Sequence, residues 1–213
     1  MKDILFKRPR YFYILFIPFL LLGGVAIHVT RKSDLFLEIN SHYSPFADLF
    51  FFWNTSLGNG AVFIVFCLVI FWRNISYGIL SLITFAFSAI IPQFFKKVIF
   101  SDFERPVKFF RGDQSMHWVE GIERHSMHSF PSGHSVSIFA LAFLATMLVK
   151  NKAWGLLFAF IAIITAYSRV YLAQHFFEDI YAGACIGVIC TMMTFLIFEK
   201  WIKGKKGLDR KLF

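Results

Sequence analysis

Long apolar stretches alternate with short polar segments along this 213-residue chain. Six of the stretches hold few or no charged residues and approach the ~20 residues with which a helix crosses the hydrocarbon core of a bilayer. We therefore predict six transmembrane helices, at about residues 11–29, 56–72, 74–95, 132–149, 153–168 and 180–198. The predicted fold is all-α, an integral membrane bundle of six helices that forms a single domain over residues 1–213.

The segment between the first two stretches is amphipathic rather than uniformly apolar. Over residues 34–52, apolar positions such as Leu35 and Phe36 are mixed with polar ones such as Asp34 and Glu38. This mixture favours a helical segment that lies in the membrane interface on the non-cytoplasmic side. The alternative is a lid that packs on the bundle.

Two glycines in the last stretch, Gly183 and Gly187, form a G-x-x-x-G pattern that lets two helices approach closely. Packing against another helix of the same chain is favoured over dimerisation. The pattern leaves the oligomeric state open.

Composition supports a lipid environment. Hydrophobic residues make up 57% of the chain and charged residues only 16%, below the quarter or so usual in soluble domains. These proportions exclude a soluble globule and a disordered chain. The three cysteines all lie inside apolar stretches, which argues against a disulfide scaffold.

The formal net charge of +9 raises the question of a nucleic-acid partner. The distribution of basic residues indicates a membrane instead, because 13 of the 22 flank one end of the predicted helices. An excess of Lys and Arg marks the cytoplasmic side, so we predict cytoplasmic termini, the inner membrane of a bacterium and no nucleic-acid partner. The 13 are Lys2, Lys7, Arg8, Arg10, Arg73, Lys150, Lys152, Lys200, Lys203, Lys205, Lys206, Arg210 and Lys211.

Polar residues on the opposite side gather in three clusters. The first follows the third stretch and consists of Lys96, Lys97 and Arg105-Pro106. The second opens the fourth stretch and consists of Pro131-Ser132-Gly133-His134. The last comprises Ser168-Arg169 at the end of the fifth stretch with His175 and Asp179 before the sixth. Regular alternation of the helices brings all three to the non-cytoplasmic side. Charged groups are costly near a membrane, so their convergence predicts a functional site.

The residue types in these clusters suit a phosphate group. Lys97, Arg105 and Arg169 supply positive charge for the phosphoryl oxygens, and arginine binds such oxygens bidentately. Ser132 and Gly133 open an apolar helix, where free backbone N–H groups attract an anion.

Two histidines supply candidate covalent and proton-transfer chemistry. His175 and Asp179 are spaced i, i+4, so the carboxylate can orient the imidazole and leave Nε2 as a nucleophile. His134 can protonate the leaving group. The alternatives are an ordinary contact at a helix start and a structural histidine.

The three clusters together resemble the tripartite motif of the type 2 phosphatidic acid phosphatase family. The second and third motifs agree throughout. In the first, the family has Lys, six residues and Arg-Pro, whereas here seven residues separate Lys97 from Arg105, which leaves Lys96 as an alternative motif lysine.

The resemblance implies a six-helix bundle and a phosphohistidine mechanism without metal or other cofactor. His175 would be the nucleophile, Asp179 its orienting partner and His134 the general acid. The phosphate-binding residues would be Lys97, Arg105, Ser132, Gly133 and Arg169. From the residues alone, the histidines at 125, 128 and 134 lack the spacing and cysteine partners typical of zinc sites.

The predicted function is an integral membrane lipid phosphatase with its active site on the periplasmic or external side. Undecaprenyl diphosphate is the favoured substrate; lipid A phosphates, phosphatidylglycerol phosphate and phosphatidic acid are alternatives. Two other functions stay open: a lipid phosphotransferase that uses the same site, and a non-enzymatic protein that binds anionic lipids.

Overall fold

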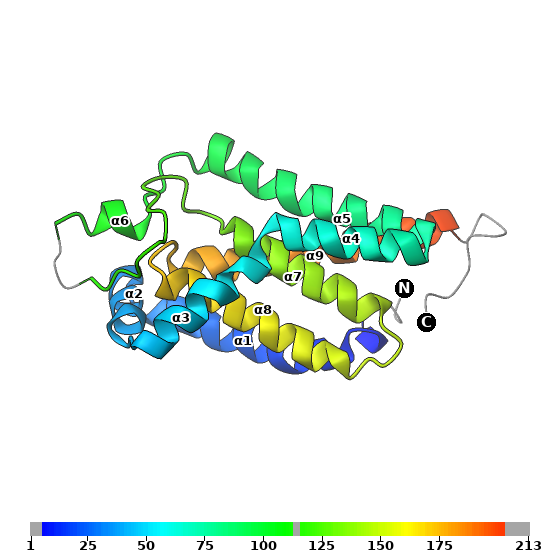
Figure 1. Ribbon diagram of the computed structural model, residues 1–213, viewed down its shortest axis with the longest axis horizontal. Coiled ribbons are helices and arrows are strands. Elements are labelled where there is room, and N and C mark those ends of the chain that lie inside the picture. Colours follow the sequence, from blue (N-terminus) through cyan, green and yellow to red (C-terminus); the bar gives the residue numbers. More distant parts are fainter. Residues whose placement is uncertain (1–5, 113–115, 203–213) are drawn as a thin grey trace.

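Helices form the regular structure of the computed structural model, which describes residues 6–112 and 116–202 (Figure 1). No strand occurs within those two ranges, so the all-α fold class is confirmed there. Several residues counted for the orientation lie outside the described ranges: Lys2, Lys203, Lys205, Lys206, Arg210 and Lys211.

Six helices are the main elements, and shorter ones connect them. The main helices are α1 (Arg10–Val29), α4 (Gly60–Arg73), α5 (Ile75–Phe94), α7 (Gly133–Leu148), α8 (Trp154–Tyr171) and α9 (Phe177–Ile202). The shorter elements are α2 (Lys32–Ser41), α3 (Pro45–Asn54), the 3₁₀ turn η2 (Thr55–Gly58), the π-helix η3 (Phe95–Ile99) and α6 (Pro106–Phe109).

Four helices are long and apolar enough to cross a membrane: Arg10–Val29, Ile75–Ile99, Trp154–Tyr171 and Phe177–Phe198. A fifth span is formed if the pair Pro45–Gly58 and Gly60–Arg73, bent by 51°, is counted as one. The protein is therefore a membrane protein. The apolar helix α7 has 16 residues, so the sixth crossing stays a prediction.

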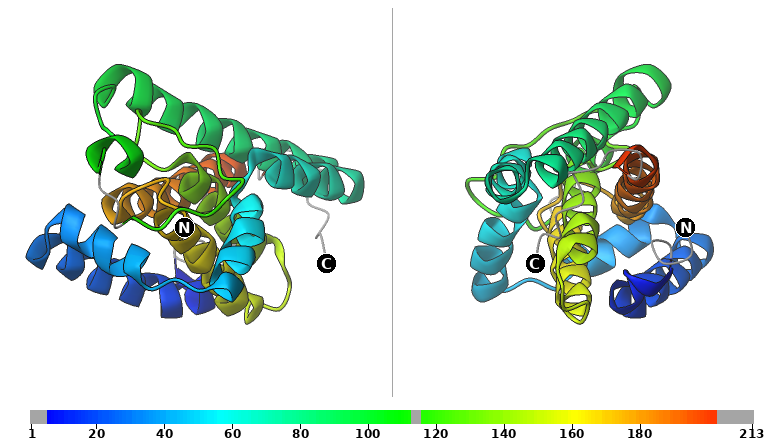
Figure 2. Two further views of the ribbon diagram at one scale, coloured as in Figure 1. Left: turned by 60° about the vertical axis from the view of Figure 1, so that its left-hand side comes forward. Right: turned by 90° about the vertical axis from the view of Figure 1, so that its right-hand side faces the viewer.

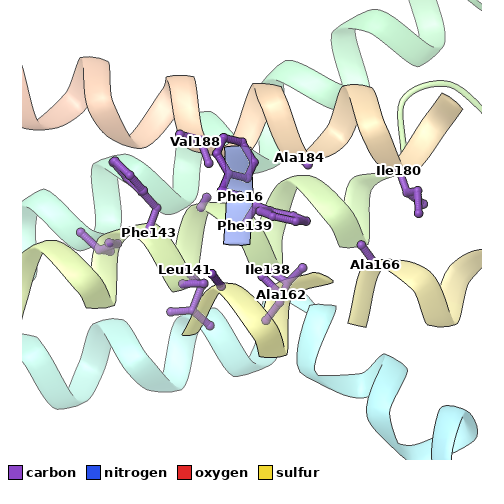
Figure 3. Close-up of a cluster of buried hydrophobic side chains, with 14 of the residues drawn as sticks. Phe16, Ile138, Phe139, Leu141, Phe143, Ala162, Ala166, Ile180, Ala184 and Val188 are labelled. Atoms are coloured by element: carbon purple, nitrogen blue, oxygen red, sulfur yellow. The ribbon is translucent and has the colours of Figure 1, made fainter. Parts of the chain in front are cut away.

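Helix α7 lies at the centre of the bundle. In Figures 1 and 2, α1 and α5 lie on opposite sides of it. Almost every residue from Ser135 to Met147 is buried, which explains why α7 is apolar all round rather than on one face. In Figure 3 its side chains Ile138, Phe139 and Phe143 pack among those of α1, α8 and α9.

Close packing of α9 on α7 depends on glycine. A Cβ atom added to Gly187 would lie 2.5 Å from the carbonyl oxygen of Val136, and one added to Gly183 would lie 2.8 Å from that of Ser132. The G-x-x-x-G pattern therefore faces a helix of the same chain, as favoured from the sequence.

Another apolar helix precedes the span predicted from residue 56. Helix α3 already exposes large apolar side chains, among them Phe46, Leu49 and Trp53, and α4 continues it after a bend. The predicted amphipathic segment 34–52 thus divides into α2, which buries Phe36 against the bundle, and α3, which forms a span with α4 if the bent pair is counted as one. The interfacial location of this segment stays a prediction.

The first residue of α1 and the last residues of α9 lie away from the long connection between η3 and α7. In Figure 1, α1 begins and α9 ends at one end of the bundle, and α6 lies at the other. Part of this connection is fixed to the helices by polar contacts. The Asn40 side chain accepts from the His117 N–H at 2.9 Å, and His117 Nε2 lies 2.8 Å from Asp48 Oδ1. His117 therefore fixes its part of the connection to α2 and α3.

Candidate active site

Five of the eight predicted site residues line one cleft of about 360 Å³. These five are Arg105, Gly133, His134, Arg169 and His175. Ser132 and Asp179 lie directly behind this lining, fully buried. Lys97 is the exception, because its side chain is exposed and does not line the cleft.

His175 is held by the carboxylate predicted to orient it. Its Nδ1 lies 3.2 Å from Asp179 Oδ2, and both side chains are at least 98% buried. The same oxygen accepts from the Ser129 hydroxyl at 2.5 Å and from the Phe176 N–H at 2.9 Å. Because Nδ1 faces the carboxylate, Nε2 is the ring nitrogen available for chemistry.

The His175 N–H donates to the Arg169 carbonyl at 3.1 Å. This bond fixes the tight turn between α8 and α9, and with it the position of the imidazole relative to Arg169. The pKa of His175 is well below its usual range, because of burial first and then of the positive charges of Arg105, Lys96 and Arg169. A neutral imidazole is the nucleophilic form, so this environment keeps His175 ready to attack at neutral pH.

Arg105 is fixed by two backbone carbonyls. Its Nε donates to Met127 at 3.0 Å and its Nη1 to Gln174 at 3.3 Å. Burial lowers the pKa of this guanidinium, and the charge of Asp179 opposes the shift. An arginine stays protonated under such conditions, so Arg105 presents a fixed positive charge to the cleft.

Arg169 is also almost completely buried. Its Nη1 donates to the Thr55 hydroxyl at 2.7 Å. Its Nε has no hydrogen-bond partner within the described residues. A buried donor without a partner is costly, and a bound anion in the cleft would satisfy it.

The N-terminus of α7 forms part of the cleft wall. The Ser132 hydroxyl accepts from the Ser135 N–H at 3.4 Å and from its hydroxyl at 3.0 Å, so Ser132 caps the helix from behind. The first N–H groups of a helix have no partner inside it. Gly133 lines the cleft, and a Cβ atom added there would meet no protein atom within 4 Å. An anion can therefore approach these N–H groups closely.

Lys96 and Lys97 differ in their position relative to the cleft. The Lys96 side chain is 93% buried and lines the cleft with Arg105 and Arg169. The two lysines lie in the π-helix η3, where Phe100 N–H donates to Phe95 carbonyl at 2.8 Å across a wider turn. The wider turn directs Lys96 inward and Lys97 outward, so the geometry favours the alternative motif lysine, and the role of Lys96 is a proposal.

Comparisons with known proteins fit this arrangement. The sequence profile described as the PAP2 superfamily matches residues 77–203, which include all three motifs. The chain belongs to the PAP2 superfamily. The resemblance drawn from the motifs is thereby confirmed, as is the enzyme class, because PAP2 members are phosphatases that hydrolyse phosphate esters.

Relatives of this PAP2 protein are themselves named for lipid substrates. It is 22% identical over 184 residues to a lipid A 4'-phosphatase of Porphyromonas gingivalis, covering 80% of this chain and 76% of the relative. It is 26% identical over 189 residues to an undecaprenyl-diphosphatase of Sulfolobus acidocaldarius, covering 84% and 87%. Its fold is similar to the crystal structure of Aquifex aeolicus LpxE, with a TM-score of 0.66, 23% identity and coverage of 76% and 93%.

Sequence reasoning missed several residues of the PAP2 site, and three of them contact or adjoin the predicted ones. Ser129 contacts the Asp179 carboxylate, Thr55 contacts Arg169, and Gly58 lines the cleft. Thr55 and Gly58 fall near the start of a predicted span, and their partners are more than 70 positions away. Of the three, only Ser129 could have been suggested from the sequence, because it lies close to the second motif along the chain.

No group of three or more His, Cys, Asp or Glu side chains suited to a metal ion occurs in the described part of the chain. Independence from metals stays a prediction.

Proposed function

We propose that this PAP2 protein is a membrane lipid phosphatase that forms a phosphohistidine on His175. The observation that carries the proposal is the buried His175 and Asp179 pair beside a cleft that also holds Lys96, Arg105 and Arg169. A site that only attracted anionic head groups would need the cations, but neither a neutral buried imidazole nor a carboxylate to orient it.

In the first step the cations and the α7 N-terminus bind the phosphoryl oxygens. Nε2 of His175 attacks phosphorus, the P–N bond forms, and the P–O bond to the lipid breaks. His134, across the cleft, gives a proton to the leaving oxygen. Lys96, Arg105 and Arg169 stabilise the charge on the equatorial oxygens in the transition state.

In the second step the phosphohistidine is hydrolysed. His134 takes a proton from water, and the water oxygen attacks phosphorus. The P–N bond then breaks, inorganic phosphate leaves and His175 is restored. Asp179 holds the His175 ring in one orientation through both steps.

The proposed substrate is a phosphate or diphosphate on a long apolar anchor, with undecaprenyl diphosphate favoured. Phe85, Ala89 and Pro92 of α5 line part of the cleft with apolar groups. A lipid chain there would gain roughly 0.8 kcal/mol per buried methylene, which a soluble phosphate ester forgoes. Lipid A phosphates, phosphatidylglycerol phosphate and phosphatidic acid are the competing substrates.

The proposed location is the inner membrane of a bacterium, with both termini in the cytoplasm and the cleft on the periplasmic or external side. The distribution of the 22 basic residues supports this orientation.

The test is phosphate release by the purified protein from the four lipids above and from a water-soluble phosphate ester. We expect turnover of lipid substrates that persists in a chelator, is inhibited by vanadate and disappears in His175→Ala and His134→Ala. Full activity in either variant would refute the assignment of these residues, and preference for the soluble ester would refute the lipid substrate. Transfer of phosphate to an added lipid instead of water would identify a phosphotransferase.

A further inference from the structure

The second apolar span is interrupted beside the cleft. Helix α3 ends at Asn54, the 3₁₀ turn η2 covers Thr55–Gly58, and α4 begins at Gly60 after a bend of 51°. Irregular backbone at membrane depth is tolerated where it is buried in protein or lines a cavity. The residues at this break, Gly58, Asn59 and Gly60, line the active-site cleft. The break in the helix therefore forms part of the cleft wall.

The turn is held in one conformation by its own hydrogen bonds. The Asn59 N–H donates to the Ser56 carbonyl at 3.0 Å, and the Asn59 side chain accepts from the Ala61 N–H at 2.9 Å. The second bond caps α4. The residues of the turn therefore have fixed positions relative to the cleft.

Thr55 is the first residue of this turn and contacts Arg169. Its buried hydroxyl accepts from Arg169 Nη1 at 2.7 Å, across 114 positions of sequence. A hydroxyl orients a guanidinium without neutralising it, whereas a carboxylate at this place would cancel the charge needed for phosphate. The contact leaves Nε, which has no partner in the described residues, for another acceptor.

Gly58 is the last residue of the turn and packs on His134. A Cβ atom added to Gly58 would lie 3.0 Å from Cβ and 3.2 Å from Cδ2 of His134, and 3.1 Å from its carbonyl oxygen. These distances are at the lower limit of real contacts, so a larger residue would displace the imidazole or the start of α7. The close approach is what requires glycine at this position.

We propose that the turn η2, Thr55–Gly58, is a fourth element of the catalytic site in which Thr55 positions Arg169 and Gly58 positions His134. The inference rests on the proposed function, because it assigns these contacts to phosphate binding and proton transfer. Neither residue touches the reacting atoms, so both are positioning residues. Each contact makes a separate prediction.

For Thr55, the test compares Thr55→Val with Thr55→Ser. Valine keeps the shape and removes the acceptor, and we expect kcat/KM to fall at least tenfold, with a parallel loss of affinity for vanadate. Serine restores the acceptor and should restore both quantities to within about threefold of wild type. The matched control is Thr146→Val, which makes the same change at a buried threonine of α7 that bonds the Ala142 carbonyl at 2.8 Å. Its kcat/KM should be unchanged.

For Gly58, the test is the leaving-group dependence of Gly58→Ala. If His134 is displaced, kcat/KM should fall at least tenfold for a lipid phosphomonoester, whose alkoxide needs a proton, and much less for p-nitrophenyl phosphate, whose leaving group does not. The matched control is Gly24→Ala, where the added Cβ meets only the end of the Tyr181 side chain, at 3.2 Å. This control should lower neither rate.

Thermal unfolding in detergent is measured for every variant, and Thr55→Ala replaces Thr55→Val if the latter does not fold. Wild-type kcat/KM and vanadate affinity in the Thr55 variant, or failure of serine to restore them, would overturn the role of Thr55. An equal loss for both leaving groups would overturn the role of Gly58. Failure of the proposed function is distinguishable from either result, because the wild-type protein itself would then release no phosphate.

Discussion

The carbonyl oxygen of Asp179 accepts a hydrogen bond from the Ser132 N–H at 3.0 Å. This bond joins the first turn of α9 directly to the N-cap of α7. Asp179 orients the proposed nucleophile, and the N-terminus of α7 faces the phosphate cleft. The hydrogen bond therefore fixes their positions relative to each other. Any change that separates α7 from α9 should therefore alter the geometry of the active site.

Gly183→Ala tests this coupling. The added Cβ atom would lie 2.8 Å from both the Ser132 carbonyl oxygen and the Ser135 Cβ, so α9 must move away from the α7 N-terminus. We expect a loss of stability of about 1–3 kcal/mol and a fall in kcat, measured by unfolding and phosphate release. Gly187→Ala meets the Val136 carbonyl at 2.5 Å one turn further from the cleft, so it should destabilise the fold as much while costing less activity. Equal activity in both variants would argue against the coupling.

Ser129→Ala tests the support of the carboxylate. Without the hydroxyl, Asp179 Oδ2 keeps, among the described residues, the His175 ring and the Phe176 N–H as partners. A hydrogen bond to a charged group contributes about 1.5–3 kcal/mol, so kcat/KM should fall by roughly 10- to 100-fold. The control is Ser126→Ala, whose exposed side chain lies in the same connection. Wild-type kcat/KM in Ser129→Ala would show that Ser129 does not support the carboxylate.

The features that could be predicted from the sequence are those with a local pattern. His175 and Asp179 lie four residues apart, and this spacing alone brings them together at the start of a helix. Alternation of apolar stretches was enough to collect the three motifs at one end of the bundle. Thr55 and Arg169, by contrast, are 114 positions apart, and their contact follows only from the packing of η2 on α8.

Asp48 shows why the sequence predicts an interfacial segment where the structure has the apolar helix α3. A carboxylate inside an apolar segment suggests an interfacial helix, because a charge is costly in lipid. In the structure Asp48 Oδ1 accepts a hydrogen bond from the Tyr171 hydroxyl and contacts His117, so the polar group is satisfied by partners that local sequence does not indicate. The inward direction of Lys96 was also not predictable from local sequence. It depends on a π-helical turn, which directs neighbouring side chains differently from an α-helical turn.

Lys96→Ala and Lys97→Ala form a matched pair. The two changes remove the same charge at adjacent positions, but only Lys96 lines the cleft. We expect at least a tenfold loss of kcat/KM for Lys96→Ala, since one cation that faces the phosphoryl oxygens is removed. Lys97→Ala should stay near wild type. Equal losses would indicate a general effect of net charge, and the reverse order would return the motif role to Lys97.

Reporter fusions test the proposed orientation. A reporter fused after Phe213 should read cytoplasmic and one inserted at Asp113 should read external; both positions lie outside the described residues. The reason is the excess of basic residues on the side of the termini. The opposite readings would place the cleft in the cytoplasm and exclude a substrate presented at the outer face.

The pH dependence of kcat/KM tests the neutral imidazole of His175. The attacking form is unprotonated, so activity falls as pH decreases through the pKa of His175 in the free enzyme. Burial and the charges of Arg105 and Lys96 lower this pKa, which places the acid limb below the ordinary histidine value of 6.5. Lys96→Met removes one of these charges and should move the limb to higher pH, whereas Lys97→Met should leave it in place. The second ionisation of a phosphomonoester falls near pH 6 but is common to all three enzymes, so the difference between their profiles isolates His175. An unchanged limb in Lys96→Met would mean that this cation does not act on His175.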